Sequence, residues 1–489
     1  MLRLGQLTIK HLQRGPRAFS SSSRREKQRL VILGSGWGGY EVLRGVDKKR
    51  WDVVLVSPNN YFNFTPLLAS CAVGTLEFRC AIEPVRRYSP AAGIYQAWCD
   101  SIDFKNKMLQ CMPATKPSHV ASPSDTAYDH SIATTSPGSG ILFPLKYDKL
   151  VIAVGAYSQT FNTPGVKEYA HFLKDVRDAR AIRSRILECF EQANQPTLSD
   201  TDRRHLLNFA IVGAGPTGVE FAAELHDLIH AEVWEHYPSL AKMARINLYD
   251  VAPSILGMFD KNLVQYAERN FRREGISIWT SHHVNKVEAG KLHIKEQGEV
   301  PFGLLVWSTG LSPNPLIASI TELKKNSKTQ SIIVDDHLNA VRADGSSDPD
   351  VYVIGDAASH ASAPLPATAQ VANQQAKYLY KRLNKIIKDR PHEKPFEFHN
   401  QGTLAYIGDW KAIYDRPDEG GIPGLSKEKG RLAWLLWRSA YFTRTLSVRN
   451  KILVPFYWFL NCKFYIFIGG WSDTKEVSTG IFGRDLTRF

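Results

Sequence analysis

Residues 209–225 read FAIVGAGPTGVEFAAEL, and the fold of the chain can be inferred from this stretch. Its first four residues are apolar, which is typical of a buried parallel strand. Gly213, Gly215 and Gly218 follow. In a strand–turn–helix unit the first glycine allows the tight turn, the second lets backbone approach a pyrophosphate, and the third lets the helix pack close to the strand. The stretch therefore predicts a dinucleotide site at the N-terminus of a helix.

A second copy of the pattern lies near the start of the chain, where residues 30–43 read LVILGSGWGGYEVL. Gly34, Gly36 and Gly39 take the three glycine positions. Both copies sit between a strand-type run and a helix-type run, which is the context that strengthens such a match. Two dinucleotide sites in one chain suggest an electron relay, in which one cofactor stays bound and the other delivers electrons and leaves. The usual pair is FAD and a nicotinamide.

The residue that ends the next strand tests each site, because a carboxylate there usually holds a ribose diol. In the second unit, RINLYDVAP places Asp250 at this position. Its charge would also repel a 2′-phosphate, which favours NADH over NADPH. In the first unit, WDVVLVSPNN offers Ser57 instead. A hydroxyl can bond a ribose but carries no charge, so the first site does not identify its nucleotide by itself.

Three further segments extend the pattern. DVYVIGDAAS (350–359) ends a strand in Gly355 and Asp356, and in two-dinucleotide flavoproteins such an aspartate reaches the ribityl chain of the flavin. KLVIAVGA (149–156) and LLVWSTG (304–310), which ends at Gly310, are similar to the points where such chains cross between domains. The predicted fold is therefore α/β, with two Rossmann-like domains arranged as in glutathione reductase and a C-terminal membrane-associated helical tail.

The expected domains follow this order along the chain. They are a transit peptide (1–29), the first part of an FAD-binding domain (30–205), an NADH-binding domain (206–330), the return to the FAD-binding domain (331–400) and the tail (401–489). A Ser-, Thr- and Pro-rich run at 112–140 is expected to be a surface loop without chemistry.

Composition excludes two classes of function. The six cysteines form no CxxC or CxxxxC pair, which argues against a flavin-to-disulfide reductase. The net charge of +13 could indicate nucleic-acid binding, but it lies at the ends of the chain. Residues 1–29 hold eight Lys and Arg against one Glu, and residues 401–489 hold thirteen against eight acids, which leaves +1 for the middle. Nucleic-acid binding is therefore not expected.

The N-terminus, MLRLGQLTIKHLQRGPRAFSSSSRR, is rich in Arg and Ser and has no acid before Glu26. These features predict a mitochondrial transit peptide, with a disordered basic tail as the alternative. No apolar run long enough to span a membrane precedes the first strand, which favours delivery to the matrix.

Within the tail, residues 431–471 contain six Lys and Arg, no acid and many aromatic residues. This composition suits the headgroup boundary, where rings are buried and basic groups meet anionic lipid. One alternative is a transmembrane helix from Ile452 to Trp471, against which Pro455, Asn461 and Lys463 argue. A helix pair in a core or a dimer contact stays open.

Taken together, these features make the sequence similar to the type II (alternative, non-proton-pumping, rotenone-insensitive) NADH:quinone oxidoreductases of mitochondria and bacteria. The resemblance covers nearly the whole chain after the transit peptide. It is carried by GSGWGGYEVLRGVDKKRWDVVLVSPNNYFNFTPLL, by VGAGPTGVEFAAEL and by ATAQVANQQA (367–376), which matches a signature placed beside flavin and quinone. The serine at position 57 is itself shared with mitochondrial members.

The resemblance assigns roles to individual residues. The non-covalent FAD is expected to contact Gly34, Ser35, Gly36, Trp37, Gly38, Gly39, Ser57, Thr65 and Asp356. NADH, the substrate, is expected to contact Gly213, Gly215, Gly218, Asp250 and, at the crossing, Gly310. Catalytic roles fall on Glu220, directed at nicotinamide and flavin, and on Gln370 and Gln374, directed at the quinone headgroup. Asn373 stands where some relatives have His, so a scheme with an imidazole proton donor there is in doubt.

The resemblance also implies an activity and a location. NADH would reduce the flavin by hydride transfer, and ubiquinone would then take two electrons and two protons without proton pumping. The enzyme would be a peripheral homodimer on the matrix side of the mitochondrial inner membrane and would feed the respiratory chain. No EF-hand loop is present, so calcium control and metal ligands are not expected.

Each assignment has an alternative. Glu220 could only stabilise the start of its helix, Gln370 and Gln374 could be solvated, and Trp37 could serve packing. A sulfide:quinone oxidoreductase has the same fold, but it needs cysteines beside the flavin, and the 150s and 350s have none. A flavoprotein of the apoptosis-inducing type would need a basic body surface.

Overall fold

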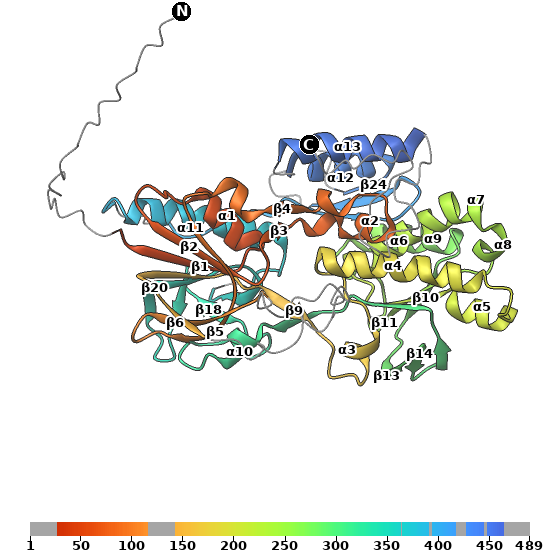
Figure 1. Cartoon of the computed structure of the whole chain (residues 1–489), viewed down its shortest axis with the longest axis horizontal. Coiled ribbons are helices and arrows are strands. Elements are labelled where there is room, and N and C mark those ends of the chain that lie inside the picture. Colours follow the sequence, from red (N-terminus) through yellow and green to blue (C-terminus); the bar gives the residue numbers. More distant parts are fainter. Residues whose placement is uncertain are drawn as a thin grey trace, which may run out of the picture.

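The computed structural model describes residues 27–115, 142–362, 364–390, 394–416, 427–444 and 447–463. It places two α/β lobes side by side, with the tail lying across their junction (Figure 1). Nearly all of the expected transit peptide and most of the 112–140 loop lie outside the described residues.

The first lobe is built on a ten-stranded sheet. At its centre β1 (Arg29–Leu33) lies parallel between β2 (Asp52–Ser57) and β8 (Lys149–Ile152), with Leu30 opposite both Val53 and Lys149. The apolar residues of β1 are buried, as is typical of a central strand in a parallel sheet. One edge continues through β5 (Gly93–Asp103), β6 (Met108–Pro113) and β7 (Phe143–Lys146).

The chain returns to this sheet after building the second lobe. Strand β20 (Ser347–Val353) pairs in parallel with β8, beyond which lie β19 (Asn339–Val341), β18 (Ile332–Val334) and β21 (Ala358–His360). Helix α11 (Ala369–Ile386) then packs on α1 (Trp37–Gly45). Strands formed by residues 332–360 therefore complete the sheet of the first lobe.

The second lobe has a four-stranded parallel sheet in the order β12-β11-β10-β16. Its strands are β10 (Asn208–Val212), β11 (Arg245–Asp250), β12 (Ser277–Thr280) and β16 (Leu304–Trp307). The principal helices of this lobe are α4 (Val176–Ala193), α6 (Pro216–Leu228) and α9 (Lys261–Arg273), seen on the right of Figure 1. A three-stranded antiparallel sheet, β13 (Val284–Glu288), β14 (Lys291–Ile294) and β15 (Gly298–Pro301), adds a second small core.

The two crossings between the lobes pair with each other. Strand β9 (Ala156–Ser158) leaves the first lobe and β17 (Leu311–Pro313) returns to it, and the two are antiparallel. Val166 of α3 (Val166–Tyr169) already lies in the core beside Tyr249 and Val287. We therefore propose that the second domain begins between β9 and α3, rather than at residue 206.

The tail joins both lobes. Strands β22 (Thr403–Tyr406), β23 (Ala412–Asp415) and β24 (Lys427–Gly430) form a sheet that α12 (Arg431–Arg444) covers, and α13 (Val448–Lys463) packs on α12. From α13, Asn450 Nδ2 donates to Cys80 O at 3.1 Å and to Glu83 Oε1 at 2.9 Å in the first lobe.

Within the part of the chain that the structure describes, no helix is both long and apolar enough to cross a bilayer. Helix α13 covers the first part of the alternative span Ile452–Trp471 and contains Pro455. Residues 464–471 of that span lie outside the described residues.

Gly45 tests the contact between α1 and α11. A Cβ on Gly45 would lie 2.2 Å from Tyr380 Cδ1 and 2.3 Å from Cγ, near the base of the ring, so the ring would have to move. Gly45→Ala should lower the free energy of unfolding by up to about 2 kcal/mol, because the overpacking cost of about 1–3 kcal/mol is only partly offset by the ~1 kcal/mol that alanine gains in a helix. Chemical denaturation measures the change.

The matched control for this change is Gly257→Ala, since nothing lies within 4 Å of a Cβ at Gly257. In the double variant Gly45→Ala with Tyr380→Ala, the two changes should destabilise less than their sum. Strict additivity would contradict the contact.

Candidate functional site

The first glycine loop has the geometry of a pyrophosphate cradle. Gly34 has φ +97°, and a Cβ there would lie 2.3 Å from Ala153 O. A Cβ on Gly39 would lie 1.9 Å from Gly34 O, which locks α1 against the turn. In contrast, nothing lies within 4 Å of a Cβ on Gly36, the residue that precedes α1. The open space at Gly36 and the free N–H groups at the helix start fit a dinucleotide phosphate.

Ser57 ends β2 beside this cradle. Its hydroxyl is buried and lies 2.9 Å from the Ser35 hydroxyl, which also donates to Tyr61 O at 2.9 Å. Ser57 Oγ further accepts from the N–H of Asn59 at 3.3 Å. The serine in the usual position of the acid is therefore part of a local network that shapes the loop.

Trp37 and Thr65 are joined directly. Trp37 Nε1 donates to Thr65 Oγ1 at 3.1 Å, and the indole packs 5.1 Å from the rings of both Phe62 and Phe64. The packing role considered for Trp37 is thus present. The indole also fixes Thr65, which lines the cavity described below.

Asp356 follows the first-lobe strand β20. No described residue donates a hydrogen bond to its carboxylate, and burial raises its pKa, while the Lys174 charge opposes this shift. The preceding turn is held by Gln375 Oε1, which accepts from Gly355 N–H at 2.7 Å. An unpartnered, desolvated carboxylate fits a ligand hydroxyl. Sequence reasoning missed Gln375, although it lies within the quoted ATAQVANQQA segment.

The second glycine loop repeats the geometry of the first. Gly213 has φ +107°, and a Cβ on it would lie 2.7 Å from Ser308 C. A Cβ on Gly218 would lie 2.0 Å from Gly213 O, whereas nothing lies within 4 Å of one on Gly215. The open position again directly precedes a helix, here α6.

Asp250 shapes this second loop. Its Oδ2 accepts from Ala214 N–H at 2.6 Å and its Oδ1 from Ala252 N–H at 2.7 Å. The carboxylate that was assigned to a ribose therefore also fixes the backbone around Gly213. Gly310, at the crossing, is exposed and accepts a hydrogen bond from Gln159 N–H at 3.1 Å.

Glu220 lies in the second turn of α6, where the two lobes and the tail meet. Its Oε1 accepts from Tyr406 N–H at 3.2 Å and from Trp437 Nε1 at 3.1 Å. Both donors belong to the tail. Burial raises the pKa of Glu220 to about 7 against these two hydrogen bonds, and the neighbouring Glu224 adds to the rise.

A cavity of about 180 Å³ opens beside Glu220. It is lined by Thr65, Pro66, Leu68, Ala69, Leu173, Pro216, Thr217, Glu220, Leu404 and Tyr441. The structure therefore brings together residues predicted separately for the first site, the second site and the tail.

Gln370 and Gln374 do not line this cavity. Gln374 Nε2 donates to His399 O at 2.8 Å and its Oε1 accepts from His399 N–H at 3.0 Å, while Gln370 Oε1 accepts from Gln401 N–H at 3.1 Å. Both amides hold the segment that leads into the tail, so neither is simply solvated.

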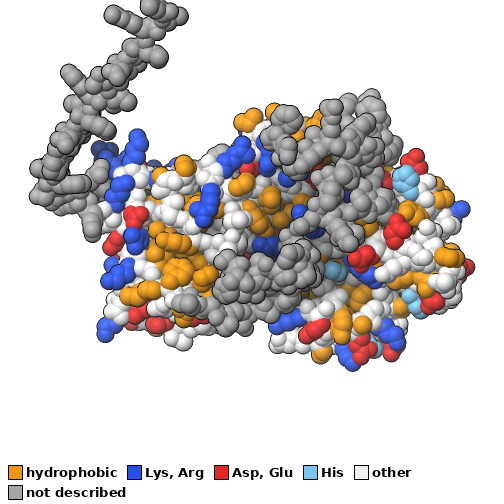
Figure 2. Space-filling model, viewed as in Figure 1, with side chains coloured by type: hydrophobic (Ala, Val, Ile, Leu, Met, Phe, Trp, Pro, Cys, Tyr) orange, Lys and Arg blue, Asp and Glu red, His pale blue; other side chains and the backbone are white. Residues whose placement is uncertain are grey.

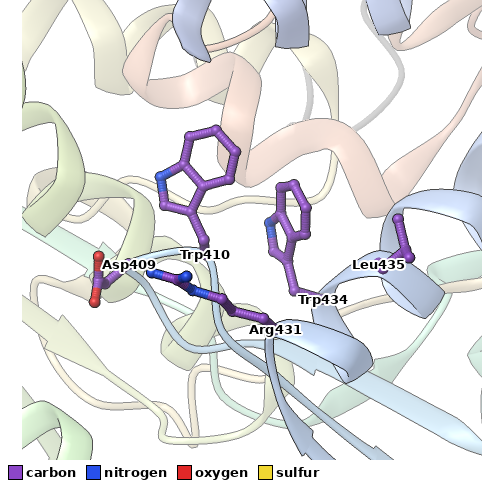
Figure 3. Close-up of a pocket in the computed structure, with 5 residues that line it drawn as sticks. All are labelled: Asp409, Trp410, Arg431, Trp434 and Leu435. Atoms are coloured by element: carbon purple, nitrogen blue, oxygen red, sulfur yellow. The ribbon is translucent and has the colours of Figure 1, made fainter.

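A larger cavity, of about 450 Å³, lies in the tail (Figure 3). The indoles of Trp410 and Trp434 stand next to each other, 4.9 Å apart, with Arg431 beneath them and Leu435 to one side. The Arg438 guanidinium lies 4.2 Å from the Trp434 ring. The combination of indoles with basic groups is typical of surfaces at the lipid headgroup level.

Comparisons with known proteins identify the relatives of the chain. The sequence profile of the pyridine nucleotide-disulphide oxidoreductases matches residues 28–376, and that of the NDH2 C-terminal domain matches residues 400–464. The chain is 38% identical to a probable NADH dehydrogenase of Dictyostelium discoideum, over 95% of this chain and 92% of that protein.

Two further relatives add detail. The internal alternative NAD(P)H-ubiquinone oxidoreductase A1, mitochondrial, of Solanum tuberosum is 36% identical, over 95% of this chain and 88% of that protein. The structure of NDH2 from Plasmodium falciparum in complex with NADH superposes with a TM-score of 0.80 at 26% identity. That likeness covers 90% of this chain and 100% of the other.

The raised pKa values of Glu220 and Glu224, each about 7, predict a pH-dependent stability. The folded state holds these protons more tightly than the unfolded state. The stability that the two protonated carboxyls contribute is therefore fully present below pH 4.5, the ordinary pKa of a glutamate, and is lost as the pH rises through about 7. The unfolding temperature should fall over this range, with a loss of roughly 3 kcal/mol per carboxyl at most.

The double variant Glu220→Gln with Glu224→Gln should show a flatter profile of unfolding temperature against pH, measured by calorimetry. The exposed Glu235→Gln serves as the control and should leave the profile as in the wild type. A double variant with the wild-type slope would show that other groups cause the dependence.

Proposed function

Because this chain belongs to the pyridine nucleotide-disulphide oxidoreductase family, and within it to the type II NADH dehydrogenases, we propose that it oxidises NADH and reduces ubiquinone. The reaction consumes NADH, one proton and quinone and yields NAD⁺ and quinol. It feeds the respiratory chain without proton pumping. The observation that carries the proposal is the cavity at Glu220, where residues of both lobes and the tail meet.

The first lobe is proposed to hold FAD, which accepts a hydride and passes two electrons on when it is bound. The open cradle at Gly36 would take the pyrophosphate, and Asp356 would bond a hydroxyl of the flavin side chain. The remaining contacts would come from Gly34, Ser35, Trp37, Gly38, Gly39, Ser57 and Thr65. Trp37 acts by positioning Thr65 at the cavity wall.

The second lobe is proposed to hold NADH. Its pyrophosphate would lie over Gly215 at the start of α6, between Gly213 and Gly218, and Gly310 would border the entry. Asp250 keeps the loop in shape and opposes a 2′-phosphate by charge. Glu220 lies on the same helix as the cradle, so it is placed to meet the nicotinamide end.

The quinone is proposed to reach the cavity from the side of the tail. Leu404 and Tyr441 form that wall, and Tyr441 stands 6.4 Å from Phe64 of the first lobe. Gln370 and Gln374 would act here by fixing the segment at His399 that leads into the wall. In this role the side-chain amides of Gln370 and Gln374 do not themselves have to bond the quinone headgroup.

The cysteine side chains argue against the alternative that this chain is a sulfide:quinone oxidoreductase. Burial raises the pKa of the thiols of Cys71 and Cys189, and that of Cys80 to about 12. A nucleophilic cysteine needs the opposite shift. Cys111 has a pKa that its hydrogen bond with Cys99 lowers, but it is not among the residues that line the cavity at Glu220. The apoptosis-inducing alternative is not favoured, because the excess positive charge lies at the chain ends.

The proposed location is the matrix face of the mitochondrial inner membrane, with peripheral attachment, as a homodimer. Five exposed apolar side chains of α12 and α13 support attachment through the tail: Leu432, Leu435, Val448, Ile452 and Phe456. Figure 2 shows hydrophobic and basic side chains next to each other at the edge of the molecule near these helices.

Gly36→Ala and Gly215→Ala test the two cradles separately. Each adds a methyl group to open space, so the fold should persist. Gly36→Ala should weaken retention of FAD, and Gly215→Ala should raise KM for NADH, each about tenfold for ~1.4 kcal/mol of lost binding. Flavin fluorescence after gel filtration and steady-state kinetics with a short-chain quinone measure the two effects.

The control is again Gly257→Ala, which should behave as the wild type. If purified wild-type protein with bound FAD failed to oxidise NADH with a short-chain quinone, the proposed function would be wrong.

Leu435→Glu with Phe456→Glu tests attachment to lipid. Two charges on exposed apolar positions should abolish co-flotation with vesicles of anionic phospholipid, because each substitution removes a large apolar side chain that would otherwise be buried in the lipid. Oxidation of NADH with ferricyanide should stay near the wild-type rate. Trp234→Glu, an exposed ring on the second lobe, is the control and should float as the wild type does; equal flotation of both variants would contradict the tail as anchor.

A further inference from the structure

Three acidic residues follow one face of α6. They are Glu220, Glu224 and Asp227, spaced four and three residues apart, so they are neighbours along the helix surface. Glu220 lines the cavity at the junction of the lobes. Asp227, at the other end, keeps 30% of its side chain exposed. The row therefore runs from the cavity to water.

Glu224, the middle residue, is 6% exposed and has no cation in hydrogen-bonding contact among the described residues. Its oxygens accept from Ser70 Oγ at 2.6 Å and from Thr75 Oγ1 at 2.9 Å. Its pKa is raised to about 7, first by burial and then by the charge of Asp227, against the opposing effects of the Ser70 and Thr75 hydroxyls and the charge of Arg438 on α12. Hydroxyl partners can both give and accept a proton, so they suit a carboxyl that changes state.

Tyr406 of the tail spans the whole row. Its backbone N–H donates to Glu220 Oε1 at 3.2 Å, and its phenol donates to Asp227 Oδ2 at 2.5 Å. The ring lies 5.7 Å from Trp437, the second donor to Glu220. The tail thus covers the row and leaves Glu220, at its inner end, half-buried at the cavity.

The outer end of the row meets a cluster of titratable groups. His226 Nδ1 lies 3.3 Å from Asp227 Oδ1, and its Nε2 lies 3.5 Å from Glu274 Oε2. His226 is 5% exposed, and its Nε2 makes no hydrogen bond within the described part of the chain. Lys411 Nζ pairs with Asp409, whose side chain is 54% exposed, and with Glu274.

We propose that Glu224 and Asp227 conduct protons from this surface cluster to Glu220, along a row that Tyr406 covers. The proposal rests on the function proposed above. Quinol formation needs two protons and two electrons; NADH supplies the electrons and one proton equivalent, and one proton must come from water. When Glu220 gives up a proton in the cavity, Glu224 passes its own proton to Glu220. Asp227 then reprotonates Glu224 with a proton taken up from water at the surface cluster. No other oxidant or reductant is needed.

Glu224 and Asp227 act through Glu220 and touch no substrate. A purely structural role would favour an ion pair with a lowered pKa. Glu224 has the neutral hydroxyls of Ser70 and Thr75 as partners instead, and Arg438 is directed at the ring of Trp434, 4.2 Å away. The geometry fits proton transfer better than anchoring.

The experiment compares Glu224→Gln with the matched control Glu232→Gln in the full-length holoenzyme. Glu232 continues the same helix in a π-turn, has a buried oxygen and a pKa also raised by burial to about 7, but lies beyond the row. With a short-chain quinone, Glu224→Gln should lose tenfold or more in rate, which is at the low end for general acid–base groups. Its solvent isotope effect should rise.

With ferricyanide, which accepts electrons without protons, Glu224→Gln should change less than twofold, and Glu224→Asp should restore part of the quinone rate. An equal fall with both acceptors, or a quinone rate matching that of Glu232→Gln, would overturn the relay. A wild type that oxidises NADH with ferricyanide but reduces no quinone would instead refute the proposed function, and the relay with it.

A second readout does not depend on turnover. Infrared titration of the protonated carboxyl band should show a step near pH 7 to which Glu220, Glu224 and Glu232 contribute, and Glu224→Gln should reduce its amplitude. Glu220→Gln should shift the remaining step to lower pH, since a neutral neighbour no longer repels the Glu224 carboxylate. An unshifted step would show that the two carboxyls are not coupled and would contradict the path.

Discussion

The two hydrogen bonds from the tail to Glu220 are the contact on which the site depends. Trp437 and the backbone of Tyr406 donate to one carboxylate oxygen on the helix that begins at the second cradle. Without them, α6 would present a carboxyl to water, and the wall formed by Leu404 and Tyr441 would have no fixed place. The tail therefore completes the cavity in addition to providing an apolar outer surface.

The same contact explains why the pKa values of Glu220 and Glu224 lie near 7. Covering Glu220 removes water from it, and the desolvation outweighs the two hydrogen bonds, so the pKa rises. Glu224 experiences the same covering from α2 (Leu68–Val73) and from the tail. A group with a pKa near 7 can change its protonation state with little driving force, which is what acid–base chemistry at neutral pH requires.

The two cradles were predictable residue by residue. In each, the first and third glycines are required because backbone atoms lie closer than 3 Å to the place that a Cβ would take, and the second faces open space. Asp356 was also predicted from the sequence, and no described residue donates a hydrogen bond to its carboxylate. Other expectations were incomplete: Asp250 is engaged by its own loop, Gln370 and Gln374 hold the chain at 399–401, and Gln375 was overlooked.

The strands, the glycine turns and the family could all be inferred from the order of amino acids alone, because they depend on residues that are close together in the chain. Which groups share a cavity depends instead on how distant segments pack. Glu220 and Trp437 are 217 residues apart, and no local pattern specifies that an indole will meet this carboxylate. Burial, and with it the pKa of each carboxyl on α6, is a property of the assembled lobes and tail, since it depends on what excludes water.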